Sequence, residues 1–262
     1  MAKPGNKWAL FPHAGEYTHT TTSLKKHWAR LHAGDREPLP GRADVLAAWV
    51  LFHNGEFQKA TEAGLAAGAD GITVANKATC THATHLEPKE AQRLALLMEV
   101  AHRAEAQAEA QPDNANAWYF QAFALGRYSQ GISVAKALAE GLGSKVRKAL
   151  EMTIKLCPEH ADAHIALAAF HAEVIDKVGA LIGGMTYGAR KDTGLSLYRT
   201  ALALNPTSPV ALIEYANGLV MLEGDKRMAE ATALYEQAAA CRPLDAAEHL
   251  DVEMAKAELA DG

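Results

Sequence analysis

Residues 194–206 read Gly194-Leu-Ser-Leu-Tyr198-Arg-Thr-Ala201-Leu-Ala-Leu204-Asn-Pro206. The apolar residues recur at helical spacing, and the proline stands just beyond them, where it stops a helix and sets the turn into the next segment. The order of large and small residues returns in Ala231-Thr-Ala-Leu-Tyr235-Glu-Gln-Ala238-Ala-Ala-Cys-Arg-Pro243. Two such segments predict a chain of repeated helices.

Prolines stand at the same position after earlier segments of the chain. Pro112 and Pro158 also follow apolar runs of helical period. After three of the four prolines, a polar link leads into a new segment rich in small residues, namely 116–125, 161–174 and 209–222. The spacing between the prolines is unequal, so the repeat units carry insertions, which we place at 128–145 and 175–191.

These segments resemble tetratricopeptide repeats. Ala-Asn-Ala-Trp118-Tyr-Phe-Gln-Ala122-Phe-Ala-Leu125 is similar to the first helix of such a repeat, and the proline-terminated segments are similar to the second. His53-Asn-Gly55-Glu-Phe57-Gln-Lys-Ala60 resembles the turn between the two. The resemblance covers about residues 41 to 243 and is weakest between 72 and 112. In its insertions the layout also resembles bacterial relatives of the regulator-of-microtubule-dynamics family and repeat proteins associated with TRAP transporters.

The resemblance implies an all-α fold, a TPR-like helical-hairpin solenoid with expanded inter-helix loops and a C-terminal capping helix. Each hairpin cannot bury its apolar face alone, so neighbouring hairpins stack and share a core. The predicted domains are an irregular N-terminal arm over 1–40, with one short helix at Ser23–Leu31, and a repeat domain over 41–262. The repeat domain is expected to hold hairpins near 43–68, 73–110, 114–157, 160–205 and 209–242, followed by the capping helix Ala246–Leu259.

Composition narrows the class of protein. The 262 residues carry a formal net charge of −5, so the basic field of a non-specific nucleic-acid binder is absent. The three cysteines are far apart and form no CxxC pair, which favours a reducing compartment. The sequence shows neither a signal peptide nor a run of about 18–20 apolar residues. We therefore expect a cytoplasmic protein without a transmembrane segment.

The predicted binding face is the groove formed by the first helix of each hairpin. Its expected contact residues are mostly apolar: Tyr119, Phe123, Arg127, Ile165, Glu173, Ile213 and Asn217. Such a groove either holds the protein's own chain, as 178–187 or the N-terminal arm, or it receives an apolar peptide, a partner helix or a lipid-like ligand. The leading prediction is a non-enzymatic scaffold or adaptor that binds a protein or peptide partner.

The alternative function uses the two insertions. Both place glycines and apolar residues before a basic cluster at the start of a helix, where free backbone N–H groups and cations together bind anions. The cluster residues are Lys145, Arg147, Lys148, Arg190 and Lys191. They predict a carrier or sensor of a small amphipathic or anionic ligand. Helix-extending insertions with a solvated basic edge, or a lid for a partner, explain the same residues.

The twelve histidines invite a metal hypothesis. His160, His164 and His171 could share one helix face, with Glu173 as a further ligand, and His82 and His85 form a second pair. Their spacing matches no recognised metal signature, so buried histidines of the core are the favoured interpretation. No nucleophile elbow or HExxH motif occurs. The expectation is a protein without catalytic residues, metal or cofactor.

Overall fold

The long helices follow the pattern of apolar runs and prolines seen in the sequence. The computed structural model describes residues 7–261, which contain fourteen α-helices, two 3-10 helices and no β-strand. The all-α class predicted from the sequence is therefore confirmed. The elements are α1 (Thr21–Leu31), α2 (Ala43–His53), α3 (Phe57–Ala66), η1 (Gly68–Gly71), α4 (Ile72–His85), α5 (Glu90–Ala110), α6 (Ala115–Gln130), α7 (Val134–Ala139), α8 (Leu142–Leu156), α9 (Ala161–Val178), α10 (Ala180–Tyr187), α11 (Lys191–Leu204), α12 (Pro209–Glu223), η2 (Asp225–Arg227), α13 (Met228–Ala239) and α14 (Ala246–Asp261).

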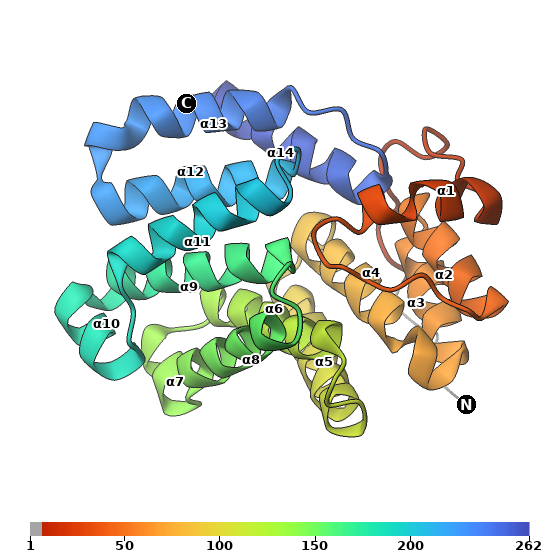
Figure 1. Ribbon diagram of the computed structural model, residues 1–262, viewed down its shortest axis with the longest axis horizontal. Coiled ribbons are helices and arrows are strands. Elements are labelled where there is room, and N and C mark those ends of the chain that lie inside the picture. Colours follow the sequence, from red (N-terminus) through yellow and green to blue (C-terminus); the bar gives the residue numbers. More distant parts are fainter. Residues whose placement is uncertain (1–6, 262) are drawn as a thin grey trace.

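The five expected hairpin segments each contain two long helices. These pairs are α2 with α3, α4 with α5, α6 with α8, α9 with α11, and α12 with α13, and the members of each pair pack on each other. The two insertions fold as the short helices α7 and α10, which lie at one edge of the molecule (Figure 1). The tetratricopeptide resemblance itself remains a prediction.

Caps and prolines explain where the helices begin and end. The side chains of Asn114 and Ser208 accept hydrogen bonds from the backbone N–H groups of Ala117 and Ala211, which caps α6 and α12. α5, α8 and α11 each end two residues before a proline. Gly141 precedes α8 with a φ of 64°, a left-handed conformation that suits glycine.

Small side chains allow the paired helices to approach closely. Ala122, Ala168 and Ala216, on α6, α9 and α12, are essentially inaccessible to solvent. A tighter contact occurs at Gly218 in α12, where a Cβ atom would lie 2.3 Å from the ring of Tyr198. That ring also stacks on Tyr215, with 5.2 Å between the centroids. The core thus depends on small residues at helix crossings.

The C-terminal helix makes contacts beyond the last hairpin. α14 packs on α12 and α13, as expected of a helix over Ala246–Leu259, and it also contacts α2. In Figure 1 the blue loop after α13 reaches the red N-terminal part, where α14 begins. Arg30 of α1 donates to Glu248 of α14 over 2.7 Å. α14 therefore joins the two ends of the helical array.

The N-terminal arm is held by the first hairpin. Trp28 of α1 is buried and meets Trp49 of α2 edge to face at 5.7 Å. After α1 the chain forms a tight loop over residues 32–37, in which His32 and Asp35 are both only 2% exposed. Among residues 7–261, no helix is both long enough and apolar enough to cross a lipid bilayer.

Candidate ligand-binding site

A cavity of about 410 Å³ lies between the inner faces of the helices. Its wall comes mainly from α4, α6, α8, α9, α12 and α14, with the loop after α1. The volume falls within the range of roughly 300–1,000 Å³ that is usual for small-molecule sites. The wall includes all seven residues predicted from the sequence as groove contacts, Tyr119, Phe123, Arg127, Ile165, Glu173, Ile213 and Asn217.

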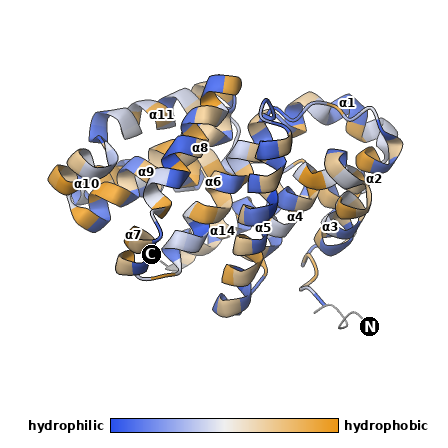
Figure 2. Cartoon of the chain, turned by 90° about the horizontal axis from the view of Figure 1, so that it is seen from below, coloured by the Kyte–Doolittle hydropathy of each residue, from blue (hydrophilic) through white to orange (hydrophobic). Residues whose placement is uncertain are grey.

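One part of the wall is apolar. It is formed by side chains of α6, α7, α8 and α9, namely Phe120, Phe123, Val134, Leu138, Leu142, Val146, Leu150, Phe170 and Val174. The short helices of the insertions border this part, and α10 exposes Leu181 and Met185, which are 76% and 82% accessible. Figure 2 shows hydrophobic residues along α10 at the edge of the molecule. An alkyl or aromatic group would find dispersion contacts along the apolar wall.

The charged residues of the wall are predominantly acidic. Eight are carboxylic acids, Asp35, Asp162, Glu173, Glu214, Asp245, Glu248, Asp251 and Glu258. Only four are lysine or arginine, Arg30, Lys77, Arg127 and Lys177. With all of them ionised, the wall carries four more negative than positive charges. A cationic group is therefore favoured over an anionic one.

Asp162, at the start of α9, is a carboxylate of the cavity wall whose charge is only partly offset by a neighbouring cation. Within residues 7–261 its side chain has no hydrogen-bond or ion-pair partner, because the nearby Lys77 donates to Asp35 instead. Burial raises the pKa of Asp162 to about 7, and the charge of Asp35 acts in the same direction. Gly34 makes the space: a Cβ atom there would lie 2.3 Å from the Asp162 carboxylate oxygen.

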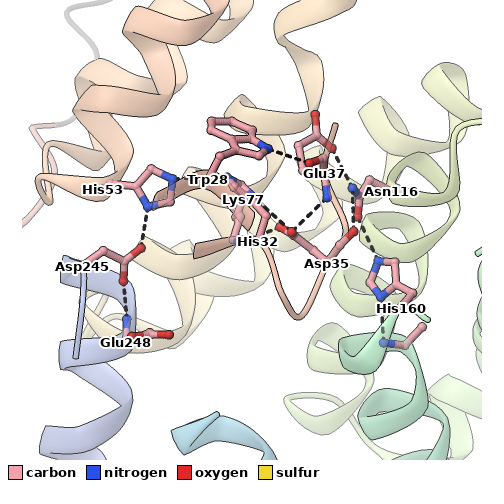
Figure 3. A network of polar contacts seen from close by, with 11 residues as sticks. Trp28, His32, Asp35, Glu37, His53, Lys77, Asn116, His160, Asp245 and Glu248 are labelled. Atoms are coloured by element: carbon pink, nitrogen blue, oxygen red, sulfur yellow. Dashed lines mark hydrogen bonds and ion pairs between the residues drawn. The ribbon is translucent and has the colours of Figure 1, made fainter. Parts of the chain in front are cut away.

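Asp35 is the centre of the buried polar network in Figure 3. Its carboxylate accepts hydrogen bonds from His32 Nδ1 at 2.8 Å, Lys77 Nζ at 2.5 Å and the Glu37 backbone N–H at 3.2 Å. Burial alone would raise the pKa of Asp35, but its interactions with His32 and Lys77 hold it well below its usual range. Lys77 keeps its proton because the negative charge of Asp35 outweighs the effect of burial and raises the pKa of the ammonium group.

A chain of two histidines and two carboxylates crosses from this centre to α14. The His53 Nδ1 lies 2.6 Å from Asp245 Oδ2, and the Nε2 atoms of His32 and His53 face each other at 3.3 Å (Figure 3). Burial lowers the pKa of His53 to about 4, so its ring is neutral at pH 7. With each Nδ1–H donated to a carboxylate, the two facing Nε2 atoms are both acceptors. A proton taken up by the pair would lie between them.

Asn116 connects the same network to α9. Its amide group donates to Glu37 Oε2 at 2.6 Å and to the Asp35 carbonyl at 3.1 Å, and its oxygen accepts from His160 Nε2 at 2.9 Å. His160 Nδ1 accepts from the Ala163 N–H, so the proton must sit on Nε2. Burial raises the pKa of Glu37 to about 8. One buried amide thus connects the loop after α1, α6 and the start of α9.

The polar residues predicted for the groove already have partners within the protein. Arg127 donates to Glu214 over 2.6 Å and lies over the ring of Phe123. Asn217 accepts from the hydroxyl of Tyr235 at 2.7 Å. Glu173 accepts from Gln130 and pairs with Lys177, and Tyr119 packs beside the His160 ring. These contacts fix the shape of the wall before any ligand arrives.

The five basic residues of the insertions lie elsewhere, and none of them is part of the cavity wall. Arg147 donates to the Tyr187 carbonyl at 2.7 Å, which joins the two insertions. Lys191 pairs with Glu223 at 2.6 Å. The Arg190 backbone N–H donates to His171, whereas its side chain is exposed, as are Lys145 and Lys148.

The histidines singled out in the sequence have separate structural contacts. His160 caps α9, His164 Nε2 donates to the Pro158 carbonyl, and His171 Nδ1 accepts from the Arg190 N–H. His82 stacks on Trp8, whereas His85 lies 3.3 Å from Asp251. Within residues 7–261 these histidines do not gather into a metal-binding group.

No protein-family model matches the chain, and no curated protein matches it. The site must therefore be interpreted from its own geometry. Sequence patterns missed the loop over 32–37 and the acidic residues of α14, because both reach the cavity only through the closure of the array.

Proposed function

We propose that the chain binds a small amphipathic molecule, with an apolar tail and a cationic amino group, inside the cavity between its helices. The apolar wall of α6, α8 and α9 would hold the tail. Asp162, with the acidic residues around it, would hold the amino group. The observation that carries the proposal is a preformed cavity whose wall combines an apolar surface with a carboxylate, Asp162, that has no hydrogen-bond or ion-pair partner among residues 7–261.

The raised pKa of Asp162 supports a cationic ligand. A carboxylate with a pKa of about 7 lacks a neighbouring positive charge sufficient to offset its burial. A bound ammonium group would supply that charge and a charge-assisted hydrogen bond. The proposal keeps the carrier or sensor role of the sequence alternative. It takes its chemistry from the cavity wall rather than from the basic insertions.

The adaptor role predicted from the sequence would use the same face. Part of that face comes from Asp245 and from Glu248, Asp251, Met254 and Glu258 of α14, which line the cavity. A peptide lying along the groove would have to pass α14, which the Arg30–Glu248 ion pair joins to α1. A small molecule fits within the cavity of about 410 Å³, and this favours the ligand carrier.

The first experiment is native mass spectrometry of the freshly purified protein, followed by extraction and identification of any bound small molecule. A titration then compares decylamine, decanol and decanoate by isothermal calorimetry. We expect decylamine to bind at least tenfold more tightly than decanol, and decanoate to bind most weakly. Decylamine affinity should fall as pH drops below 7, because protonation of Asp162 removes the charge that the amine recognises.

The matched variants are Asp162→Asn on the cavity wall and Asp113→Asn on an exposed turn. Asp162→Asn should remove the preference for decylamine over decanol. It should leave the affinity for decanol unchanged, because decanol binding depends on the apolar wall. The second should change neither. A preference for decanoate, or a co-purified anionic ligand, would contradict the proposed charge class. Failure of all three probes to bind would contradict the cavity as a ligand site.

A further inference from the structure

A second cluster of polar side chains lies outside the cavity, where the N-terminal arm meets α14. It consists of His13 and Glu16 from the arm and His249 from α14. The two imidazole rings stack with 4.0 Å between their centroids. Their Nδ1 atoms each lie 3.3 Å from a different oxygen of the Glu16 carboxylate. The ligating atoms of all three residues fall within 4.8 Å of one another.

These distances suit a tetrahedral metal ion. Zinc binds histidine nitrogen and carboxylate oxygen at about 2.0–2.2 Å, and two ligand atoms of a tetrahedron of that size lie about 3.3–3.5 Å apart. Each histidine Nδ1 lies at this distance from a Glu16 oxygen, but the two oxygens are different ones. Rotation of the Glu16 carboxylate and of the two stacked rings would bring one oxygen and both nitrogens around a single ion. Two histidines and one glutamate leave a fourth position for water.

The surroundings of His249 agree with a ligand role. Its Nε2 atom faces Glu253 Oε1 at 3.7 Å, on the ring edge away from Glu16. A carboxylate at the second nitrogen of a metal-binding histidine orients the ring and makes it a stronger ligand. The hydroxyl of Tyr17 hydrogen-bonds His249 Nδ1 at 3.0 Å, and an ion bound at this nitrogen would displace that contact. His13 is one third exposed, so an ion can reach the site from solvent.

We propose that His13, Glu16 and His249 bind one divalent transition-metal ion, of which zinc fits best, and that this ion fastens the N-terminal arm to α14. Imidazole ligands favour zinc, copper and nickel over magnesium and calcium. Because His13 and His249 come from opposite ends of the chain, the ion would tighten the closure that encloses the cavity. The site does not depend on the cavity ligand.

The test measures metal binding directly. Metal-free protein is titrated with Zn²⁺ by calorimetry and with Co²⁺ by visible absorption, and its melting temperature is recorded with and without Zn²⁺. We expect one equivalent to bind and Co²⁺ to give the intense bands of a tetrahedral site. A hundredfold excess of free Zn²⁺ over its dissociation constant should raise the melting temperature by about 5–10 °C.

Three variants remove one ligand each, His13→Ala, Glu16→Gln and His249→Ala, and His102→Ala removes an exposed histidine as the matched control. Each ligand variant should weaken Zn²⁺ binding at least tenfold, and the control should bind as the parent does. Equal binding by all four variants, or no binding by the parent protein, would overturn the proposal. If His249→Ala fails to fold, the two arm variants still decide, since both residues are on the partly exposed N-terminal arm.

Discussion

Replacing Asp245 tests whether α14 holds the two ends of the helical array together. The carboxylate of Asp245 has two roles in the structure. It accepts from the Glu248 backbone N–H at 2.8 Å, which caps the first turn of α14, and it accepts from His53 Nδ1 at 2.6 Å. Asp245 itself is buried, with only 3% of its surface exposed. Asp245→Ala removes both contacts, whereas Asp245→Asn retains a capping oxygen and removes the charge.

The size of the effect follows from these contacts. Loss of an N-cap costs about 1 kcal/mol. Leaving the buried N–H of His53 without an acceptor costs about 1–3 kcal/mol more. We therefore expect Asp245→Ala to lower the free energy of unfolding by about 3 kcal/mol, equivalent to about 6–12 °C in melting temperature. Asp245→Asn should cost about 1–2 kcal/mol, since asparagine also caps helices well.

The assay is unfolding in guanidinium chloride, with Asp113→Ala as a control at an exposed aspartate. The control should stay within about 0.5 kcal/mol of the parent protein. If Asp245→Ala unfolds at the same denaturant concentration as Asp113→Ala, then α14 does not secure the closure and the reasoning is refuted. Equal losses for the alanine and asparagine variants would show that the charge, rather than the cap, dominates.

Four further substitutions can be measured by the same denaturation. Gly218→Ala should lower the free energy of unfolding by about 1–3 kcal/mol because its methyl group meets the Tyr198 ring. Gly126→Ala is the control: no atom lies within 4 Å of its Cβ position, so it should be neutral or stabilising by up to about 1 kcal/mol. Asp162→Asn should leave the free energy of unfolding unchanged near pH 4 and raise it by about 1–3 kcal/mol at pH 8. The folded-state pKa of Asp162 is raised to about 7, so this carboxyl group destabilises the folded protein as pH rises above the pKa it has in the unfolded chain. An equal effect at both pH values would contradict this. Asn116→Ala should cost about 2–4 kcal/mol, since three buried polar groups lose their partner, and a loss below about 1 kcal/mol would count against the network.

Local patterns in the sequence were sufficient for the helices. The proline at 206 and the alternation of large and small residues before it predict a helix that the structure places at Lys191–Leu204. Similar reasoning from Trp118 and Ala122 predicts α6, and helical periodicity then places Tyr119 and Phe123 on one face. Both side chains line the cavity. What they bind remains a prediction, because lining a cavity does not identify its ligand.

The polar site depended on contacts that no local pattern records. Asp245 and His53 are 192 positions apart, and Tyr17 and His249 are 232 apart. Their pairing depends on how all the intervening helices pack against one another. The cluster of His13 and His249 was missed for that reason. His160 and His164, whose spacing in the sequence suggested a shared helix face, have separate partners in Asn116 and the Pro158 carbonyl.

The contact between the first and last parts of the chain changes how the protein should open. In a linear array of helical pairs the terminal units have a neighbour on one side only, so their amide hydrogens exchange first. Here α1 and α14 are neighbours, and Arg30 is paired with Glu248 across them. Exchange should therefore begin at exposed segments such as α7 and α10, with α1 and α14 protected together. The two ends would behave as one cooperative unit.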